Sequence, residues 1–100
     1  AETLAHRLGR SHTLDWSGLA RVLAQVLDAR VYHPDLNAHN VLVDNHNRWW
    51  VIDFDRATVG AHPRAGQRMV ARLCASLAKL NLSVPLSRDQ WLRQIEQHRH

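Results

Sequence analysis

Several residue types are scarce in this sequence, and each scarcity excludes a class of protein. The one cysteine, Cys74, cannot form an internal disulfide, which excludes a disulfide-rich secreted domain and fits a reducing compartment. Its neighbours Leu73 and Leu77 predict a buried thiol rather than a reactive one. No apolar run approaches the ~18 residues that a membrane span needs, and no signal-peptide pattern opens the sequence. We therefore expect a cytoplasmic protein that is soluble or peripheral to a membrane.

The length and the charge of the chain set further limits. Its 100 residues, of which 45% are apolar, allow one small domain with a modest core. Thirteen basic residues exceed nine acidic ones, for a net charge of +4, and all of the basic residues except Lys79 are arginines. Arginine binds phosphate and carboxylate through a planar fork, so the composition favours an anionic partner. A solvated basic surface is the alternative, because net charge concerns association rather than fold.

The spacing of apolar residues predicts four helices and one hairpin. Helical spacing covers residues 1–8, 16–27 and 69–80, and Ser87 with Gln90 forms a capping-box pattern that begins a fourth helix. Gly9 is placed to end the first helix, and Asp15 to cap the second. Two short β-type runs, 41–43 and 49–52, are separated by turn-forming residues, which predicts a hairpin. The predicted fold class is mostly α with a small β-hairpin.

Polar side chains concentrate around the two ends of the predicted hairpin. Asn40 stands immediately before the first strand and Asp53 immediately after the second, with Asp35 on the preceding loop. Because a hairpin brings its two ends together, we expect these three side chains to converge. Mg²⁺ prefers oxygen ligands, typically one or two protein carboxylates completed by waters and substrate phosphates. The remaining carboxylate would be free to act on a nucleophile, which is the division of labour that phosphoryl transfer needs.

The same residues match the spacing of a protein-kinase catalytic loop. That loop is written H-R-D-L-x-x-x-N and is followed, after a short strand pair, by D-F-G. This chain reads HPDLNAHN from His33 to Asn40 and DFD from Asp53 to Asp55. The longer strings YHPDLNAHNVLVD and WWVIDFDRA closely resemble the 3-deoxy-D-manno-octulosonic acid (Kdo) kinases of Gram-negative bacteria, part of the wider lipopolysaccharide kinase group. The resemblance covers nearly the whole chain.

The resemblance implies a role for each residue of the motif. Asp35 resembles the catalytic aspartate that receives or orients the hydroxyl proton of the acceptor. Asn40 and Asp53 resemble the ligands of the Mg²⁺ that bridges the phosphates of ATP. His33 is expected to brace the loop backbone rather than to do chemistry. Asn37, at a position where protein kinases commonly have lysine, would touch the transferred phosphoryl group or orient Asp35.

The segment after Asp53 departs from the protein-kinase pattern, which has glycine where this chain has Asp55. In an extended segment the Asp55 side chain would project to the same side as that of Asp53, as a second metal contact. A structural pairing of Asp55 with Arg56 or another arginine is equally open. Three arginines follow and would attract the anionic acceptor or the anionic membrane surface: Arg64, Arg68 and Arg72.

The family implies a reaction and a fold. ATP would donate its γ-phosphoryl group to a hydroxyl of Kdo in the inner core of lipopolysaccharide, with Kdo-lipid A or a related precursor as acceptor, on the cytoplasmic face of the inner membrane. The chain would be the C-terminal lobe of a protein-kinase-like (α+β) fold, with a catalytic loop at 32–40, a metal-binding hairpin at 41–55 and helices after about 64. Its glycines form no phosphate-binding loop, so the N-terminal ATP lobe is absent. We expect the isolated chain to turn over poorly and to expose an apolar face where that lobe would pack.

Other interpretations of these residues stay open. Asp and Asn also furnish turns and caps, and His39 and His46 suit surface or turn positions better than a zinc site. A kinase for a small hydroxylated substrate, such as an aminoglycoside or choline, shares the H-x-D-x-x-x-x-N loop. A non-catalytic, kinase-like binding module would keep the fold and lose the chemistry. No nucleic-acid partner is expected, because basic residues are not interleaved with exposed aromatics. Core packing is predicted for all four tryptophans: Trp16, Trp49, Trp50 and Trp91.

Overall fold

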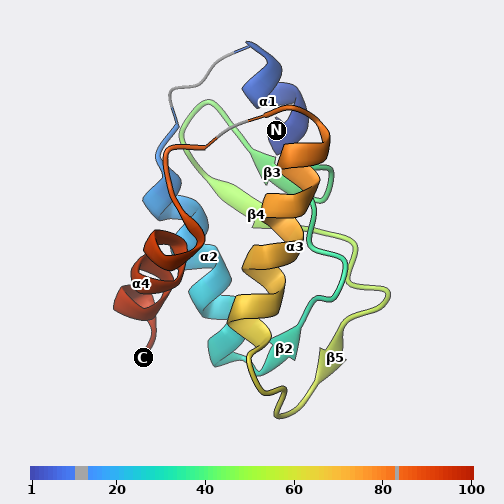
Figure 1. Ribbon diagram of the computed structural model, residues 1–100, viewed down its shortest axis with the longest axis vertical. Helices are drawn as coiled ribbons and strands as arrows, with labels where there is room; N and C mark the ends of the chain where they lie inside the picture. The colour runs from blue at the N-terminus through green and yellow to red at the C-terminus, as the bar shows by residue number, and fades with distance from the viewer. Residues whose placement is uncertain (11–13, 83) are drawn as a thin grey trace.

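The computed structural model describes residues 1–10, 14–82 and 84–100 of the chain. Within these ranges four helices and five short strands follow one another (Figure 1). The helices are α1 (Leu4–Arg10), α2 (Trp16–Asp28), α3 (Ala65–Lys79) and α4 (Arg88–His98). The strands are β1 (Glu2–Thr3), β2 (Val31–Tyr32), β3 (Val41–Val43), β4 (Trp49–Val51) and β5 (Thr58–Val59). The fold is therefore mixed α/β, with more strands than the predicted hairpin alone.

The strands form two small antiparallel sheets. β3 pairs with β4 in the predicted hairpin, with Leu42 opposite Trp50, and β1 pairs with the other edge of β3. β2 pairs with β5, so that Tyr32 lies opposite Thr58. The hairpin is thus confirmed, whereas the pairings of β1 and β5 were not predicted. Strands of two residues are too short for an alternation of apolar and polar side chains to become visible in a sequence.

The turn of the hairpin is held by the Asp44 carboxylate. This group accepts hydrogen bonds from the backbone N–H groups of His46 and Arg48, and its Oδ2 lies 2.8 Å from Arg48 Nε. The bond from the Arg48 backbone, followed by that from the Arg48 side chain and that from His46, lowers the pKa of Asp44 to about 2. Asn47 has a left-handed backbone, with φ of 58°. Each of these residue types suits the turn for a separate physical reason.

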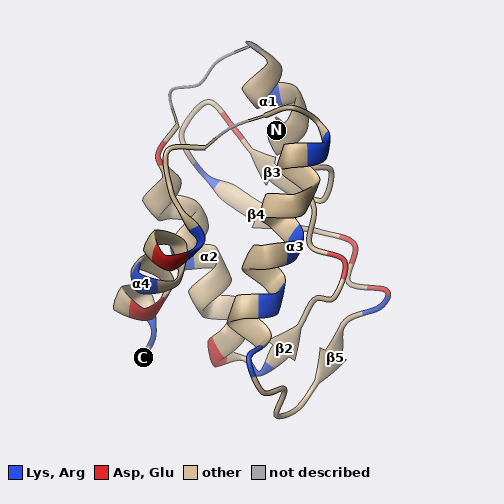
Figure 2. Cartoon of the chain, viewed as in Figure 1, with Lys and Arg blue, Asp and Glu red and all other residues tan. Residues whose placement is uncertain are grey.

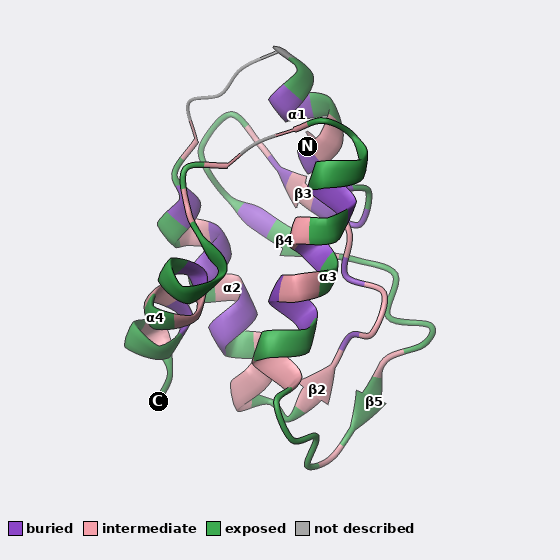
Figure 3. Ribbon diagram, viewed as in Figure 1, coloured by how far each residue is buried: buried purple, intermediate pink, exposed green. Residues whose placement is uncertain are grey.

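The core is formed by the hairpin and by residues of all four described helices, including Leu4 and Leu8 of α1. α2 buries the apolar stripe that its spacing predicts, and it packs against α4, β4 and β2. The ring of Trp16 lies 5.9 Å from that of Trp49 and 5.8 Å from that of Trp91, measured between centroids, so one side chain joins α2, β4 and α4. Figure 3 shows the buried residues on the inward sides of α2 and α3 and along the hairpin. This packing holds the hairpin, and hence the residues at its two ends, against the helices.

Two helix starts differ from their predictions. Asp15 occupies the N-cap position of α2, but its side chain makes no capping bond to the helix and instead accepts a hydrogen bond from the Ser17 hydroxyl at 2.6 Å. α3 begins at Ala65, in line with the expectation of helices after about 64 but four residues before the apolar spacing starts at residue 69, and it follows Arg64, whose backbone is left-handed with φ of 60°. The apolar stripe of α3 begins only at Met69, because the first turn of the helix is mostly exposed to solvent. Periodicity therefore located the buried part of the helix and missed its first turn.

The ends of the other two helices give one correction and one confirmation. Gly9 lies inside α1 instead of ending it, since the helix continues to Arg10. The capping box at the start of α4 is present, with the Ser87 hydroxyl accepting from the Gln90 backbone and the Gln90 side chain accepting from the Ser87 backbone. No helix within the described ranges has the length and apolar character needed to cross a bilayer.

Some residues predicted to be buried are partly exposed. Trp50 is 41% exposed, whereas the other three tryptophans are buried as predicted. Cys74 is only half-buried, and desolvation raises the pKa of its thiol. Ile52 and Phe54, just after β4, are each 42% exposed. Large apolar side chains are therefore in contact with solvent at the end of the hairpin that carries the polar motif.

Candidate active site

The loop between β2 and β3 folds around its own side chains. The Asn40 amide nitrogen donates to the Asp35 carbonyl at 2.8 Å, and Asn40 Oδ1 accepts from the Asn37 backbone N–H at 2.9 Å. The Asn37 side chain donates to the same Asp35 carbonyl at 3.0 Å and accepts from the His39 backbone N–H at 2.8 Å. Asn40 is only 4% exposed. The loop therefore fixes Asp35 and Asn40 relative to each other, as a catalytic loop requires.

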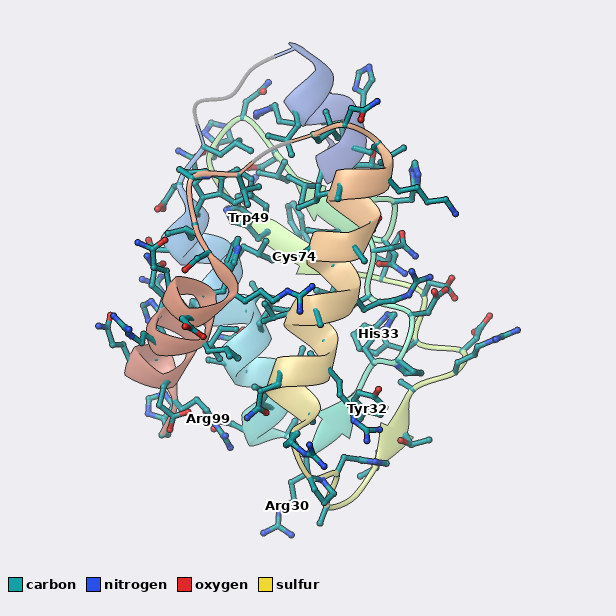
Figure 4. The ribbon with its side chains drawn as sticks, in the orientation of Figure 1. Arg30, Tyr32, His33, Trp49, Cys74 and Arg99 are labelled. Atoms are coloured by element: carbon teal, nitrogen blue, oxygen red, sulfur yellow. The ribbon has the colours of Figure 1, made fainter. Side chains whose placement is uncertain are left out.

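The segment after β4 is bonded to this loop through Ile52. The Ile52 N–H donates to the Asn40 carbonyl at 2.9 Å, and the Ile52 carbonyl accepts from His33 Nε2 at 3.0 Å. Because a carbonyl can only accept, Nε2 carries the imidazole proton. His33, labelled in Figure 4, is 1% exposed, and its ring packs in a T-shaped arrangement with the Phe54 ring at 5.0 Å between centroids. These contacts place Asp53 beside the loop, and they fit the bracing role expected of His33.

The acidic residues after β4 are exposed. Asp53 has a left-handed backbone, with φ of 62°, which is uncommon for a residue other than glycine. The carboxylates of Asp53 and Asp55 make no ion pair or hydrogen bond with the residues that the structure describes, so the alternative pairing of Asp55 with Arg56 is not seen there. Both carboxylates are thus open to solvent, in a segment whose preceding residue, Ile52, is bonded to the Asn40 backbone.

Helix α3 supports the loop from its other side. Arg72 donates from a guanidinium nitrogen to Asp35 Oδ1 at 2.9 Å, and one turn further along the helix Ser76 Oγ accepts from the Ala38 backbone N–H at 3.0 Å. The Arg72 bond is the main cause that lowers the pKa of Asp35, and the charge of Arg56 acts in the same direction. Figure 2 shows a basic band in the middle of α3 near acidic segments of the neighbouring loops.

Sequence reasoning missed these two contacts of α3. Ser76 interrupts the apolar stripe of α3 and lies 8% exposed, which marks a buried polar residue in need of a partner. Arg72 precedes it by four residues, so both side chains project from one face of the helix. This spacing of two polar residues was the feature of the sequence that indicated a polar contact between α3 and another element. It could not have identified the loop as the partner, because the two segments are far apart in the chain.

The three arginines predicted to act together occupy different places. Arg72 binds Asp35, whereas Arg64 precedes the first turn of α3 and lines a groove against α4. Arg68 lies between them in the helix and is exposed. Only Arg72 therefore belongs to the arrangement around Asp35.

The donor set at the hairpin end suits a magnesium ion. Asn40 Oδ1 accepts one hydrogen bond and keeps a second lone pair, and the carboxylates of Asp53 and Asp55 are free of protein donors in the described structure. The described residues contain no group of three or more His, Cys, Asp or Glu side chains placed to hold a metal by themselves. A site of one amide and one or two carboxylates, completed by waters and phosphates, matches Mg²⁺ rather than Zn²⁺.

Three proteins that share one name align with about two thirds or more of this chain. A protein of Stenotrophomonas maltophilia (strain K279a) named 3-deoxy-D-manno-octulosonic acid kinase is 41% identical over 66 residues, which cover 65% of this chain and 26% of that protein. The protein of the same name in Xylella fastidiosa (strain 9a5c) is 36% identical over 73 residues, or 72% of this chain and 29% of the relative. That of Xanthomonas campestris pv. campestris (strain B100) is 42% identical over 66 residues, or 65% and 26%.

The match to a whole family is broader than the match to any of these relatives. The chain aligns with only 26% to 29% of the length of the three relatives. A profile of the Lipopolysaccharide kinase (Kdo/WaaP) family matches residues 2–97, which include the loop of Asp35 and Asn40, the acidic segment after β4 and all four helices. The chain therefore belongs to the Lipopolysaccharide kinase (Kdo/WaaP) family.

Proposed function

We propose that the protein containing this chain transfers the γ-phosphoryl group of ATP to a hydroxyl of Kdo in the inner core of lipopolysaccharide. The observation that carries this proposal is the pair of hydrogen bonds made by Asn40. Its side-chain amide donates to the Asp35 carbonyl at 2.8 Å, and its backbone carbonyl accepts from the N–H of Ile52, the residue before Asp53. An aspartate, an asparagine and a second aspartate in this relation are the parts that phosphoryl transfer needs. The relatives aligned above carry the name of a Kdo kinase.

Asp35 is the residue that would act on the acceptor. Arg72 engages Asp35 Oδ1 and leaves Oδ2 for the acceptor hydroxyl, and Asp35 is 43% exposed at its side chain, so a substrate can reach it. The lowered pKa keeps the carboxylate ionised at neutral pH. An ionised carboxylate of low basicity orients the hydroxyl and takes its proton only as the new bond to phosphorus forms.

Asn40 and Asp53 would hold Mg²⁺, with Asp55 as a further ligand. The ion, when bound, neutralises charge on the phosphates of ATP. Asn37 is engaged at both ends of its amide, by the Asp35 carbonyl and by the His39 N–H. This favours a role in shaping the loop over direct contact with the phosphoryl group.

The chain would form the C-terminal lobe of a protein-kinase-like fold, with the ATP site completed by an N-terminal lobe outside it. The relatives extend well beyond the aligned segments, which leaves room for such a lobe. The exposed apolar side chains of Trp50, Ile52 and Phe54 lie at the polar end of the hairpin and support a surface that another lobe covers. The isolated chain would accordingly bind nucleotide weakly.

The acceptor would be an anionic precursor such as Kdo-lipid A, met at the cytoplasmic face of the inner membrane. The net charge of +4 and the exposed Arg64 and Arg68 on the helix that supports Asp35 favour an anionic surface. Each basic residue near such a surface contributes about 1 kcal/mol of attraction.

The test is phosphoryl transfer by the protein expressed with any sequence that flanks this chain in its gene. With Mg²⁺-ATP and Kdo-lipid A, we expect Asp35→Asn to lower kcat about 10³-fold, because the carboxylate that orients the hydroxyl is lost. Asp89→Asn is the matched control, since Asp89 is an exposed acid in the first turn of α4, and its activity should equal that of the wild type. Circular dichroism of both variants checks that the fold is retained.

Three outcomes would contradict the proposal. Full activity of the Asp35→Asn variant would remove the catalytic role of this loop. Absence of Mg²⁺-ATP binding would instead favour a kinase-like binding module. Faster transfer to an aminoglycoside or to choline than to Kdo-lipid A would favour a small-molecule kinase.

A further inference from the structure

A second site lies away from the candidate active site, in a groove at the opposite end of β2. The groove has a volume of about 730 Å³ and is open to solvent. It is formed by the end of α2, the strand β2, the segment 60–67 and one face of α4. Asp35, Asn40 and Asp53 are not among the residues that line it. The groove is therefore separate from the candidate active site, and Arg64 is the residue that it shares with the basic surface proposed above to favour an anionic acceptor.

The groove carries an excess of positive charge. Four arginines line it and one acidic residue, Glu96, does so. The arginines are Arg30, Arg64, Arg93 and Arg99. Arg99 is already paired, since its Nε lies 3.0 Å from Asp28 Oδ1. The other three form no ion pair within the described part of the chain, and all three are exposed. Figure 4 shows Arg30 and Arg99 at the same end of the molecule as Tyr32.

Two of the unpaired arginines stand on strained backbone. Arg30 and Arg64 have φ values of 58° and 60°, in the left-handed region. That conformation is unfavourable for an ordinary residue, and glycine or asparagine adopts it more readily. The Arg30 carbonyl accepts from the Gly60 N–H at 2.9 Å, which fixes the first of these turns against the segment that leads to the second.

The remaining walls fit a ligand that joins an anionic group to an apolar body. Leu27, Leu92 and Ile95 supply an apolar floor. Gly66 also lines the groove, in the first turn of α3, where the N–H groups of Ala65 and Arg68 donate to the carbonyls of His62 and Arg64. No acidic residue occupies this first turn to offset its positive end.

We propose that this groove binds a phosphate group, with its oxygens paired to the guanidinium groups of Arg30, Arg64 and Arg93. Guanidinium and phosphate form charge-assisted, bidentate hydrogen bonds, which suits arginine better than lysine at these positions. The phosphate can belong to a membrane lipid or to a soluble phosphate ester, because both present the same oxygens. The site is independent of ATP and of Asp35.

The experiment removes the two strained arginines without adding strain. The variant Arg30→Asn with Arg64→Asn takes away two charges and places at both turns a residue that tolerates left-handed backbone. The control is Arg21→Gln with Arg88→Gln, which removes the same charge from exposed positions of α2 and α4 outside the groove. Binding is measured on the protein with its flanking sequence, without nucleotide or Mg²⁺. The probes are glycerol 3-phosphate, phosphatidylcholine vesicles containing phosphatidic acid, and vesicles of phosphatidylcholine alone.

We expect the groove variant to bind the phosphate probes at least about tenfold more weakly than the wild type, and the control variant to change binding less than twofold. Loss of binding to both phosphate probes identifies the phosphate group itself as the ligand. Loss only with phosphatidic acid vesicles identifies a lipid as its source. Equal losses of binding in the groove and control variants would show that net charge alone causes the effect and would overturn the proposal. Wild-type protein that binds neither phosphate probe would overturn it as well. An Asp35→Asn variant should bind both probes normally, which separates this site from the proposed function.

Discussion

The two halves of the candidate site are built in opposite ways. In the loop 32–40 the amide side chains are tied to the loop backbone, and His33 and Asn40 are 1% and 4% exposed. In the segment 53–56 every residue is exposed, and the Asp53 carboxylate has no protein donor in the described structure. Folding alone completes the first half. The second half keeps its oxygen atoms free, as expected of a surface that meets a cation and its phosphates.

The difference has a simple physical origin. The backbone N–H and carbonyl groups of a buried loop need hydrogen-bond partners other than water. The side chains of Asn37 and Asn40 provide these partners, because no neighbouring strand does. An exposed segment has no such need, because water satisfies its backbone and separates its carboxylates electrostatically. Mutations should therefore disturb stability in the loop and leave it nearly unchanged in the acidic segment.

The largest expected effect on stability belongs to His33, which joins the two halves. His33→Ala removes the hydrogen bond to the Ile52 carbonyl and leaves a cavity where a fully buried ring packed against Phe54. Together these losses should lower the free energy of unfolding by about 3 kcal/mol. His39→Ala is the matched control, since His39 lies in the same loop and its side chain is exposed, so a change within about 0.5 kcal/mol is expected.

Denaturant unfolding followed by tryptophan fluorescence measures both variants. Equal stabilities for His33→Ala and His39→Ala would show that the contact to Ile52 does not hold the halves together. If His33→Ala is too unstable to purify, His33→Gln replaces it. Hydrogen exchange of the Ile52 and Asn40 backbone amides is then measured, and it should be faster in His33→Gln than in the wild type.

A smaller effect compares one residue from each half directly. Asn40→Ala should lower the free energy of unfolding by about 2 kcal/mol, because the Asp35 carbonyl and the Asn37 N–H both lose a partner in a buried setting. Asp53→Asn removes the charge of an exposed carboxylate while keeping a residue type that tolerates the left-handed backbone, and it should change stability by less than about 0.5 kcal/mol. Both variants should lose Mg²⁺-dependent activity. Similar losses of stability in the two variants would refute the contrast between a prebuilt loop and a free acidic segment.

The sequence allowed prediction of the loop and the hairpin but not of what α3 adds to them. Asn40 and Asp53 could be placed at the two ends of one hairpin, because turn residues and two apolar runs are local features. The bonds from Arg72 to Asp35 and from the Ala38 N–H to Ser76 join residues 37 and 38 positions apart in the chain. No rule based on local sequence predicts which distant residues will form such bonds. The exposure of Trp50 was missed for the same reason, because it depends on what packs over the outer face of β4.

The smallest expected effect concerns the pKa of the Asp35 carboxylate, which the loop leaves accessible to solvent. Because the Arg72 hydrogen bond holds the pKa of Asp35 below its ordinary value of 3.8, Arg72→Gln should raise the pKa toward that value. A depressed pKa means that the ion pair stabilises the fold above the pKa of the unfolded chain and that this contribution fades as the pH falls through the lower, folded pKa. The stability difference between wild type and Arg72→Gln should therefore be present at neutral pH and shrink in acid below about pH 3.8.

Carbon-detected NMR titration of the Asp35 side chain reads this pKa directly, with Arg68→Gln as the control. Arg68 is an exposed arginine one turn earlier on the same helix, so its removal changes the net charge equally and leaves the contact to Asp35 intact. Only Arg72→Gln should raise the pKa of Asp35 appreciably. Equal shifts in the two variants would mean that the general charge of α3 acts on Asp35, and that Arg72 is one basic residue of a surface rather than the partner that orients the carboxylate.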